Sequence, residues 1–324
     1  MYTLAGIAIE AVSVKSWEEN VQERIFKPLV MNSSGFTGLS VRPDNHSLSY
    51  FEAETSGKLT ARTFLAQLEL IAPAGNIYSN MTDMSKWLIM QVNGGKYKGK
   101  QVIAATAVEE TKIPNSISDK RGRYDELSNA IYAMGRSLQT YKGTKIISHT
   151  GSIDGFYSNL SYLPKDSLAL FIVHNSVSAG SLLSVMNLPL IDILQNRELT
   201  DWSSRYRKDY LEDQEKNKKT VDEINALQVK NTVPSHLSLA YTGRFNHPVY
   251  GDILIGLTNN DLQIQYRSLR ATLHHWHYDQ FITMDDGKGF PDMRISFLTN
   301  DKGEIDRIST RPFEDPLTEF VRMK

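Results

Sequence analysis

The sequence predicts an α+β protein in which helices and an antiparallel sheet precede a small antiparallel β-barrel. Apolar residues first recur at helical spacing, the period changes to that of short strands from about residue 130, and a charged stretch precedes a second run of strands. A length of 324 residues is large for one compact core and agrees with two domains. We place these domains at 1–195 and 235–324, joined by a charged helical linker at 196–234.

Composition excludes several classes of protein and of site. Hydrophobic residues make up 40% and charged residues 23%, as in soluble globular proteins. The 36 basic and 37 acidic residues leave a net charge of -1, so no large basic field is available for nucleic acid or an anionic membrane. The lack of cysteine excludes disulfides, a thiolate nucleophile and a Cys-ligated metal. No run of eighteen apolar residues predicts a transmembrane segment.

The chain begins with two predicted helices. "MYTLAGIAIEAVS" lacks the basic region of a signal peptide and carries Glu10, so we interpret it as an amphipathic helix of the folded domain. Ser16 and Glu19 have the spacing of a capping box. We expect the second helix to start there, to run to about Phe26 and to be stopped by Pro28.

Between 32 and 75 the chain is rich in Ser, Gly, Asn and Pro, and predicts a long irregular excursion of the kind that often borders a site. A helix is expected from near Thr82 to a stop at Asn93-Gly94-Gly95, then a short helix within 100–112 and a polar loop at 114–124.

The next segments predict an antiparallel meander and one covering helix. The strands are "AIYAMGRSLQT", "TKIISHTG", "GFYSNLSYLP" and "DSLALFIVHNS", and the helix is "AGSLLSVMNLPLIDILQN". Residues 196–231 carry charges of both signs with a thin apolar stripe, which predicts a solvated helix.

The last part predicts a barrel of short, evenly spaced strands. Apolar residues alternate at 253–257 and at 262–266 around the turn "TNND", and "RISFLTNDKGEIDRIST" repeats the pattern with a turn at 300–303.

One tripeptide stands out as a candidate site. Thr-Gly occurs after Phe36, His149 and Tyr241, but only His149-Thr150-Gly151 closes an apolar strand, "KII", and is followed by Ser152. Gly151 would permit a substrate to approach the backbone closely, and the Ser152 N–H could face it from a strand edge.

The text around this tripeptide resembles the serine β-lactamase-like family, close to class C β-lactamases and related esterases and peptidases. The resemblance covers about residues 1 to 194, through segments that include "YTLAGIAIEAVSVKSWEENVQERIFKPLVMNSSGF", "APAGNIYSNMTDMSKWLIMQVNGGKYKGKQV" and "ISHTGSIDGFYSNLSYLPKDSLALFIVHNS". It implies an incomplete β-lactamase/transpeptidase-like domain. The last domain, with "YTGRFNHPVYGDILI" and "LHHWHYDQF", is similar to the lipocalin-like β domain appended to many such hydrolases.

The resemblance implies a catalytic assignment for His149, Thr150, Gly151 and Ser152. The family uses a Ser-x-x-Lys, a Tyr-x-Asn and a Lys-Thr-Gly or His-Thr-Gly strand. His149 and Thr150 would bind a polar or anionic group of the substrate, and the Ser152 N–H would be one donor of the oxyanion hole. Histidine in place of lysine is a weaker cation, because imidazole titrates near pH ~6.5.

Two of the three family motifs are not found where expected. No serine stands three residues before any lysine. Tyr78-Ser79-Asn80 and Tyr157-Ser158-Asn159 match Tyr-x-Asn, but neither immediately precedes the helix that begins at Tyr2, which is the family position. We therefore expect an N-terminally truncated family member, with the nucleophile upstream of Met1, that is inactive alone.

The resemblance implies acyl-enzyme hydrolysis of an amide or ester in the intact protein, without metal or cofactor. It leaves open β-lactam, D-amino-acid peptide and ester substrates, and implies a periplasmic or secreted location. One alternative is a non-catalytic protein that binds a ligand or peptidoglycan. Another is a separate upstream polypeptide that supplies the serine.

Other residues suggest sites but favour structural roles. His274, His275 and His277, with Asp279 and His247, suggest a metal site. We interpret them instead as part of an aromatic cluster that fills the barrel or its mouth, with no metal. Asp154 before Gly155 is expected to form a turn, and Trp17 and Trp87 to lie in the core.

Overall fold

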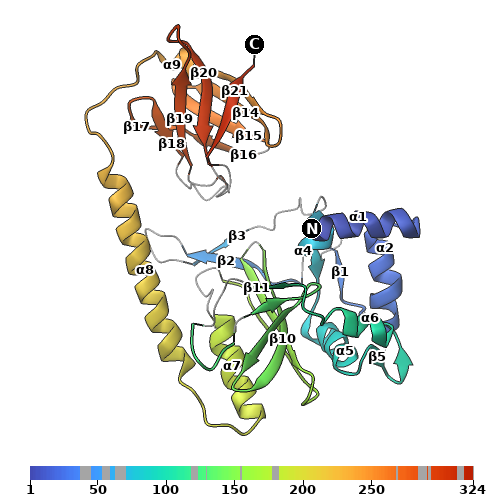
Figure 1. Ribbon diagram of the computed structural model, residues 1–324. Helices are drawn as coiled ribbons and strands as arrows, with labels where there is room; N and C mark the ends of the chain where they lie inside the picture. Colours follow the sequence, from blue (N-terminus) through green and yellow to red (C-terminus); the bar gives the residue numbers. More distant parts are fainter. Residues whose placement is uncertain are drawn as a thin grey trace. The chain divides into compact units, whose positions relative to one another are not determined.

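The computed structural model describes residues 1–36, 45–52, 59–62, 71–117, 123–128, 130–153, 155–176, 182–267, 269–283, 290, 293–311 and 317–323. Packing divides the chain into two compact units, Met1–Tyr210 and Leu211–Lys324 (Figure 1). The turn expected at Asp154 lies outside the described residues. No helix in the described ranges has both the length and the apolar character needed to cross a membrane.

The helices mostly match the predicted positions. They are α1 (Tyr2–Ser13), α2 (Trp17–Val21), the π-helical η1 (Gln22–Phe26), α3 (Lys27–Leu29), α4 (Ala72–Gly75), α5 (Met81–Val92), α6 (Ala105–Glu110), α7 (Leu182–Leu194) and α8 (Trp202–Ala226), while α9 (Ser238–Tyr241) precedes the barrel strands.

The capping box at the start of α2 is confirmed. The Ser16 hydroxyl accepts a hydrogen bond from the Glu19 N–H, and the Glu19 carboxylate accepts one from the Ser16 N–H. We expected Pro28 to stop the helical segment, but it does not. It sits in the first turn of α3, where a missing N–H costs least, and the chain leaves the helix at Val30 in a left-handed conformation.

Helix α1 forms as predicted, but its apolar side is not buried. Leu4 is 62% exposed, Ile7 55% and Val12 84%, and only Gly6 is buried. Gly6 is where α1 meets α4, since a Cβ at this position would lie 2.2 Å from the Cγ of Pro73. Helical periodicity identifies an apolar face, but it does not determine which element covers that face.

An antiparallel meander forms the centre of the first unit, as predicted. Within the described residues it has six strands in the order β12-β11-β10-β9-β8-β7. Helices α5 and α7 both pack against strands of this sheet. The strands are β7 (Ser116–Ile117), β8 (Ile131–Tyr132), β9 (Ser137–Tyr141), β10 (Thr144–Ile153), β11 (Phe156–Leu163) and β12 (Leu168–His174). Two-stranded pairs join β1 (Gly35–Phe36) to β4 (Ile77–Tyr78), β2 (Ser49–Glu52) to β3 (Leu59–Arg62), and β5 (Lys96–Tyr97) to β6 (Lys100–Gln101).

We expected α8 to be solvated throughout, but its start is packed into the first unit. Trp202 is fully buried, and its indole N–H donates to the Tyr141 hydroxyl over 2.9 Å. That hydroxyl donates to Asp192 over 2.6 Å, and Lys142 forms an ion pair with Asp192 over 2.9 Å. This buried network ties α8 and α7 to the end of β9.

A buried carboxylate links α5 to the segment that follows α3. Asp83 is 2% exposed and accepts hydrogen bonds from the Ser33 N–H, the Ser34 hydroxyl and the Lys86 ammonium. Burial opposes ionisation of Asp83, but these donors outweigh it, and the pKa of Asp83 is lowered. Lys86 also donates to the Val30 carbonyl over 2.5 Å, which fixes the end of α3.

The second unit contains a nearly closed antiparallel barrel, as the sequence predicts. Within the described residues its nine strands follow the order β16-β15-β14-β13-β21-β20-β19-β18-β17. They are β13 (Gly243–His247), β14 (Gly251–Thr258), β15 (Asp261–Tyr266), β16 (Leu269–Thr272), β17 (His274–His277), β18 (Gln280–Ile282), β19 (Arg294–Thr299), β20 (Ile305–Thr310) and β21 (Thr318–Arg322).

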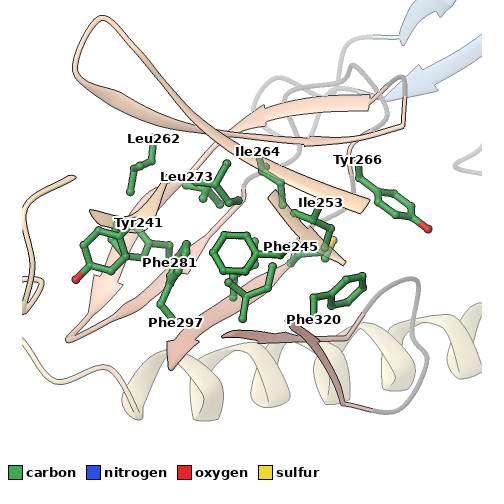
Figure 2. Packing of buried hydrophobic residues seen from close by; sticks show 14 of the residues in the cluster. Tyr241, Phe245, Ile253, Leu262, Ile264, Tyr266, Leu273, Phe281, Phe297 and Phe320 are labelled. Carbon is green, nitrogen blue, oxygen red and sulfur yellow. The ribbon is translucent and has the colours of Figure 1, made fainter. Parts of the chain in front are cut away.

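The predicted hairpins of the barrel are confirmed, and its interior is filled with side chains. Asn259 and Asn260 both have positive φ, as a two-residue hairpin turn between β14 and β15 requires. Figure 2 shows Tyr241, Phe245 and Phe297 meeting between the strands, and all three are at most 4% exposed. A barrel of this size has an interior just wide enough for such side chains.

We predict that Phe245→Ala lowers the free energy of unfolding of the barrel by about 3–5 kcal/mol, because it leaves a cavity under a fully buried ring. Hydrogen exchange of barrel peptides across a urea titration measures this. Val249→Ala, at a position 77% exposed, is the control and should change it by less than about 0.5 kcal/mol. Equal effects of the two changes would contradict the described core.

We predict that Asp83→Asn lowers the free energy of unfolding of the first unit by about 1–3 kcal/mol at neutral pH, since it weakens a buried acceptor of three donors. A carboxylate whose folded pKa is depressed stabilises the fold above its unfolded pKa of ~3.9, and this contribution is lost as pH falls through the folded pKa. The difference between wild type and variant should therefore shrink in acid. Urea titrations at several pH values measure it, and a pH-independent difference would contradict it.

Candidate active site

The His-Thr-Gly segment lies on the half of β10 that is paired on one side. β10 pairs with β9 from Thr144 to Ser148, and with β11 from Ile147 to Ile153. From His149 onward, the edge of β10 opposite β11 therefore has no strand partner within the described residues. Backbone groups on such an edge are available to a ligand.

The four predicted site residues are consecutive, so the pleat divides them between two faces. Thr150 pairs with Asn159 and Ser152 with Tyr157, and both Thr150 and Ser152 have exposed side chains. His149 and Gly151 point to the other face. A Cβ on Gly151 would lie 2.6 Å from the Ser158 hydroxyl oxygen, so this position accommodates a close cross-strand neighbour.

Two tyrosines meet His149. The Tyr132 hydroxyl lies 3.1 Å from His149 Nε2, and the Tyr2 hydroxyl lies 3.4 Å from the same nitrogen. The two hydroxyls also hydrogen-bond to each other. Tyr2 comes from the first turn of α1 and Tyr132 from β8, so three separate elements form this tyrosine–histidine cluster, which consists of Tyr2, Tyr132 and His149.

The surroundings favour the protonated phenol and the neutral imidazole. Burial, with the Tyr2 hydroxyl, raises the pKa of Tyr132 to about 12. Desolvation by the surrounding protein lowers the pKa of His149, a backbone hydrogen bond with Thr150 opposes this, and the Arg136 cation lowers it further. His149 is therefore a poorer cation than a free histidine at neutral pH.

The two Tyr-x-Asn sequences occupy different environments. Asn80 caps α5 by accepting from the Asp83 N–H over 2.9 Å, and the Ser79 hydroxyl lies 2.7 Å from that of Ser34, so this copy has local structural contacts. The copy at 157–159 lies on β11, directly beside the His-Thr-Gly segment. Its Tyr157 stacks on His174 with ring centroids 4.8 Å apart.

The barrel histidines bond within the chain. His275 Nε2 lies 2.8 Å from the Tyr278 carbonyl, and His277 Nδ1 accepts from the Val229 N–H over 3.0 Å. His247 Nδ1 accepts from the Val249 N–H over 3.1 Å. Among the described residues, no group of three or more His, Cys, Asp or Glu side chains is arranged to hold a metal ion.

Sequence reasoning did not identify Tyr2 or Tyr132 as partners of His149. Their separations from His149 are 147 and 17 residues. No local spacing signals such contacts, because they depend on how α1 and β8 reach the same end of β10.

An antiparallel meander flanked by helices, with His-Thr-Gly on an open strand edge, defines a penicillin-binding-protein-like fold. Residues 1–187 match the family model described as Beta-lactamase, which is more than half of the 324 residues. The chain therefore belongs to the Beta-lactamase family and is related to serine hydrolases. Residues 227–322 match a Domain of unknown function (DUF3471).

Three similar proteins place this membership in context. The chain is 24% identical over 280 residues to the Unguisins hydrolase ungD' of Aspergillus campestris, an alignment that covers 79% of this chain and 48% of that protein, so the chain spans about half of this relative. The octameric penicillin-binding protein homologue from Pyrococcus abyssi has the same fold, with TM-score 0.52, 17% identity and coverage of 95% of this chain and 61% of that chain. A crystal structure of SurE gives TM-score 0.49 and 17% identity, over 99% of this chain and 67% of that one.

We predict that the His149 imidazole titrates below the ~6.5 of an unperturbed histidine, because desolvation and the Arg136 cation disfavour its charged form. Nuclear magnetic resonance of histidine-labelled chain measures the midpoint, and His149→Gln assigns the signal by removing it. A midpoint above that of a histidine-containing reference peptide would contradict the described surroundings.

Proposed function

We propose that this chain carries the substrate-binding strand of a serine hydrolase that cleaves an amide or ester bond through an acyl-enzyme. The observation that carries the proposal is the position of His149 to Ser152 on β10, where no described strand pairs with the edge opposite β11. Membership of the Beta-lactamase family supports it, as does the name of the related fungal protein, which describes a hydrolase.

In this proposal His149 and Thr150 contact a polar group of the substrate, while Gly151 lets the reacting carbonyl approach the strand. The backbone N–H of Ser152 donates to the oxyanion that forms when the carbonyl is attacked. The 324-residue sequence has no Ser-x-x-Lys, and we therefore propose that the nucleophile comes from another polypeptide segment, either joined upstream or encoded separately. The catalytic part corresponds to 1–195, the linker to 196–234 and the barrel to 235–324.

The purified 324-residue chain should not hydrolyse a chromogenic β-lactam or a nitrophenyl ester above the blank rate, because it lacks the nucleophile motif. Intact-mass spectrometry after treatment with a fluorophosphonate probe should show no adduct. A stoichiometric adduct on any serine would overturn this assignment of the nucleophile.

Adding the missing segment is the positive test. A polypeptide from the same locus that carries Ser-x-x-Lys, fused or co-expressed, should restore turnover. His149→Ala should then reduce kcat/KM by about 10- to 100-fold, about the effect of one strong hydrogen bond, because it removes a side chain that shapes the polar end of the substrate-binding strand. Tyr210→Phe, at an exposed position of α8, is the matched control and should leave turnover unchanged.

The absence of Ser-x-x-Lys also favours a second candidate, a non-catalytic protein that binds a ligand or peptidoglycan. Adding the upstream segment distinguishes this binding protein from the proposed hydrolase. A binding protein would retain its ligand, but it would gain no turnover when the upstream segment is supplied.

A further inference from the structure

The tyrosine–histidine cluster is accessible, so a bound molecule can reach its polar atoms. Tyr2 is 42% exposed and Tyr132 is 37% exposed. Gly135 borders the cluster without a side chain, and a Cβ there would lie 3.6 Å from the Tyr2 ring. Whether a ligand meets a hydrogen-bond donor or an acceptor here therefore depends on the hydrogens and lone pairs of these three side chains.

The hydrogens of the neutral cluster are all used internally. Each tyrosine has one hydroxyl hydrogen, and neutral His149 with a free Nε2 lone pair offers none at that nitrogen. One hydroxyl donates to Nε2 and the other donates to its neighbouring hydroxyl oxygen. This count holds whichever tyrosine bonds to Nε2. Only oxygen lone pairs remain to face a ligand.

Two groups around the ring support this tautomer. The backbone of Thr150 hydrogen-bonds to the ring. Because Nε2 faces the two tyrosine hydroxyls, we assign this bond, and with it the ring hydrogen, to Nδ1. Arg136 is the neighbouring cation and opposes a second proton on the ring. Neutral His149 thus accepts one hydrogen bond at Nε2, from the hydroxyl of either Tyr2 on α1 or Tyr132 on β8.

Protonation of His149 reverses the direction of the hydrogen bonds. The imidazolium donates from Nε2 to a tyrosine oxygen, and one hydroxyl donates to the other. Three hydrogens now meet two internal acceptors, so one hydroxyl hydrogen must point outward. The same three side chains then present a donor.

We propose that, while His149 is neutral, the tyrosine–histidine cluster binds a hydrogen-bond donor of the substrate, such as an amide N–H or an amine, and rejects a carboxylate. This rests on the proposed function in that the bound group belongs to the acyl substrate. Tyr2 and Tyr132 are then specificity-determining residues, and a carboxylate is disfavoured because its oxygens meet lone pairs without a hydrogen between them.

Arg136, whose charge acts on His149, would favour a carboxylate, but its guanidinium is already engaged. It donates to Gln91 Oε1 over 2.9 Å and to Thr111 Oγ1 over 3.2 Å, and it lies 5.2 Å from the centroid of the Tyr162 ring. These contacts direct it toward α5 and α6. If a ligand recruited Arg136, the cluster would prefer a carboxylate to a hydrogen-bond donor. Measuring which of the two ligands binds more tightly therefore distinguishes these cases.

Benzamide and benzoate are matched probes, because they share a ring and differ in one planar group. Titration of each into the histidine-labelled 324-residue chain at about pH 8, followed through the His149 imidazole signals, gives the two Kd values. We expect benzamide to bind at least about fivefold more tightly than benzoate, the effect of one hydrogen bond. Below the titration midpoint of His149 the ranking should reverse, and this comparison needs no variant.

Tyr2→Phe removes one of the two hydroxyl oxygens whose lone pairs face the ligand, so it should reduce the benzamide preference at pH 8. Tyr210→Phe is the control and should leave it unchanged. A preference for benzoate at pH 8, a ranking that ignores pH, or no response of His149 to either probe would each overturn the inference.

These outcomes are distinct from failure of the proposed hydrolase. If the chain prefers benzoate but the upstream segment restores turnover, only the inferred preference for a hydrogen-bond donor is wrong. An intact benzamide preference without restored turnover would remove only the hydrolytic function.

Discussion

The unequal lengths of two paired strands determine which part of β10 lacks a partner among the described residues, and this is where we propose that a ligand binds. Lys142 and Gly143 both have positive φ and form the two-residue turn that sets β9 against β10, so Tyr141 faces Thr144. β9 has 5 residues and β10 has 10, so within the described part of the chain the second half of β10 has no partner on that side. His-Thr-Gly begins one residue beyond the last pair. The turn at Lys142 and Gly143 thus determines where pairing with β9 ends, one residue before the tripeptide.

The other half of β10 is buried and anchored, and this fixes the position of the half that follows it. Ile146 and Ile147 are at most 4% exposed, and the neighbouring Tyr141 is anchored to Asp192 and Trp202 by short hydrogen bonds. A strand held at one end by a packed core and a buried polar network presents its free end in a defined geometry, which sites on mobile loops do not achieve.

Caps, turns and single strands were predictable from the sequence, but contacts between elements that are distant in the sequence were not. The Ser16 capping box and the Asn259 turn follow from residues within four positions of each other, and the His-Thr-Gly strand follows from its own apolar run. The exposed side of α1, the burial of Trp202 and the approach of Tyr2 to His149 depend on which distant element arrives at a surface. Periodicity and turn signals carry no information on that choice.

The open edge and the tyrosine–histidine cluster offer complementary chemistry within one short segment. The edge of β10 would supply a backbone N–H at Ser152, which is a donor for a carbonyl oxygen. The cluster at His149 would supply lone pairs, which accept from an N–H. A substrate that carries an N–H in addition to its reacting carbonyl can use both, whereas a substrate with the carbonyl alone can use only the first. On these two assignments the segment from His149 to Ser152 favours a substrate with such an N–H, and the preference arises from hydrogen-bond direction rather than from charge.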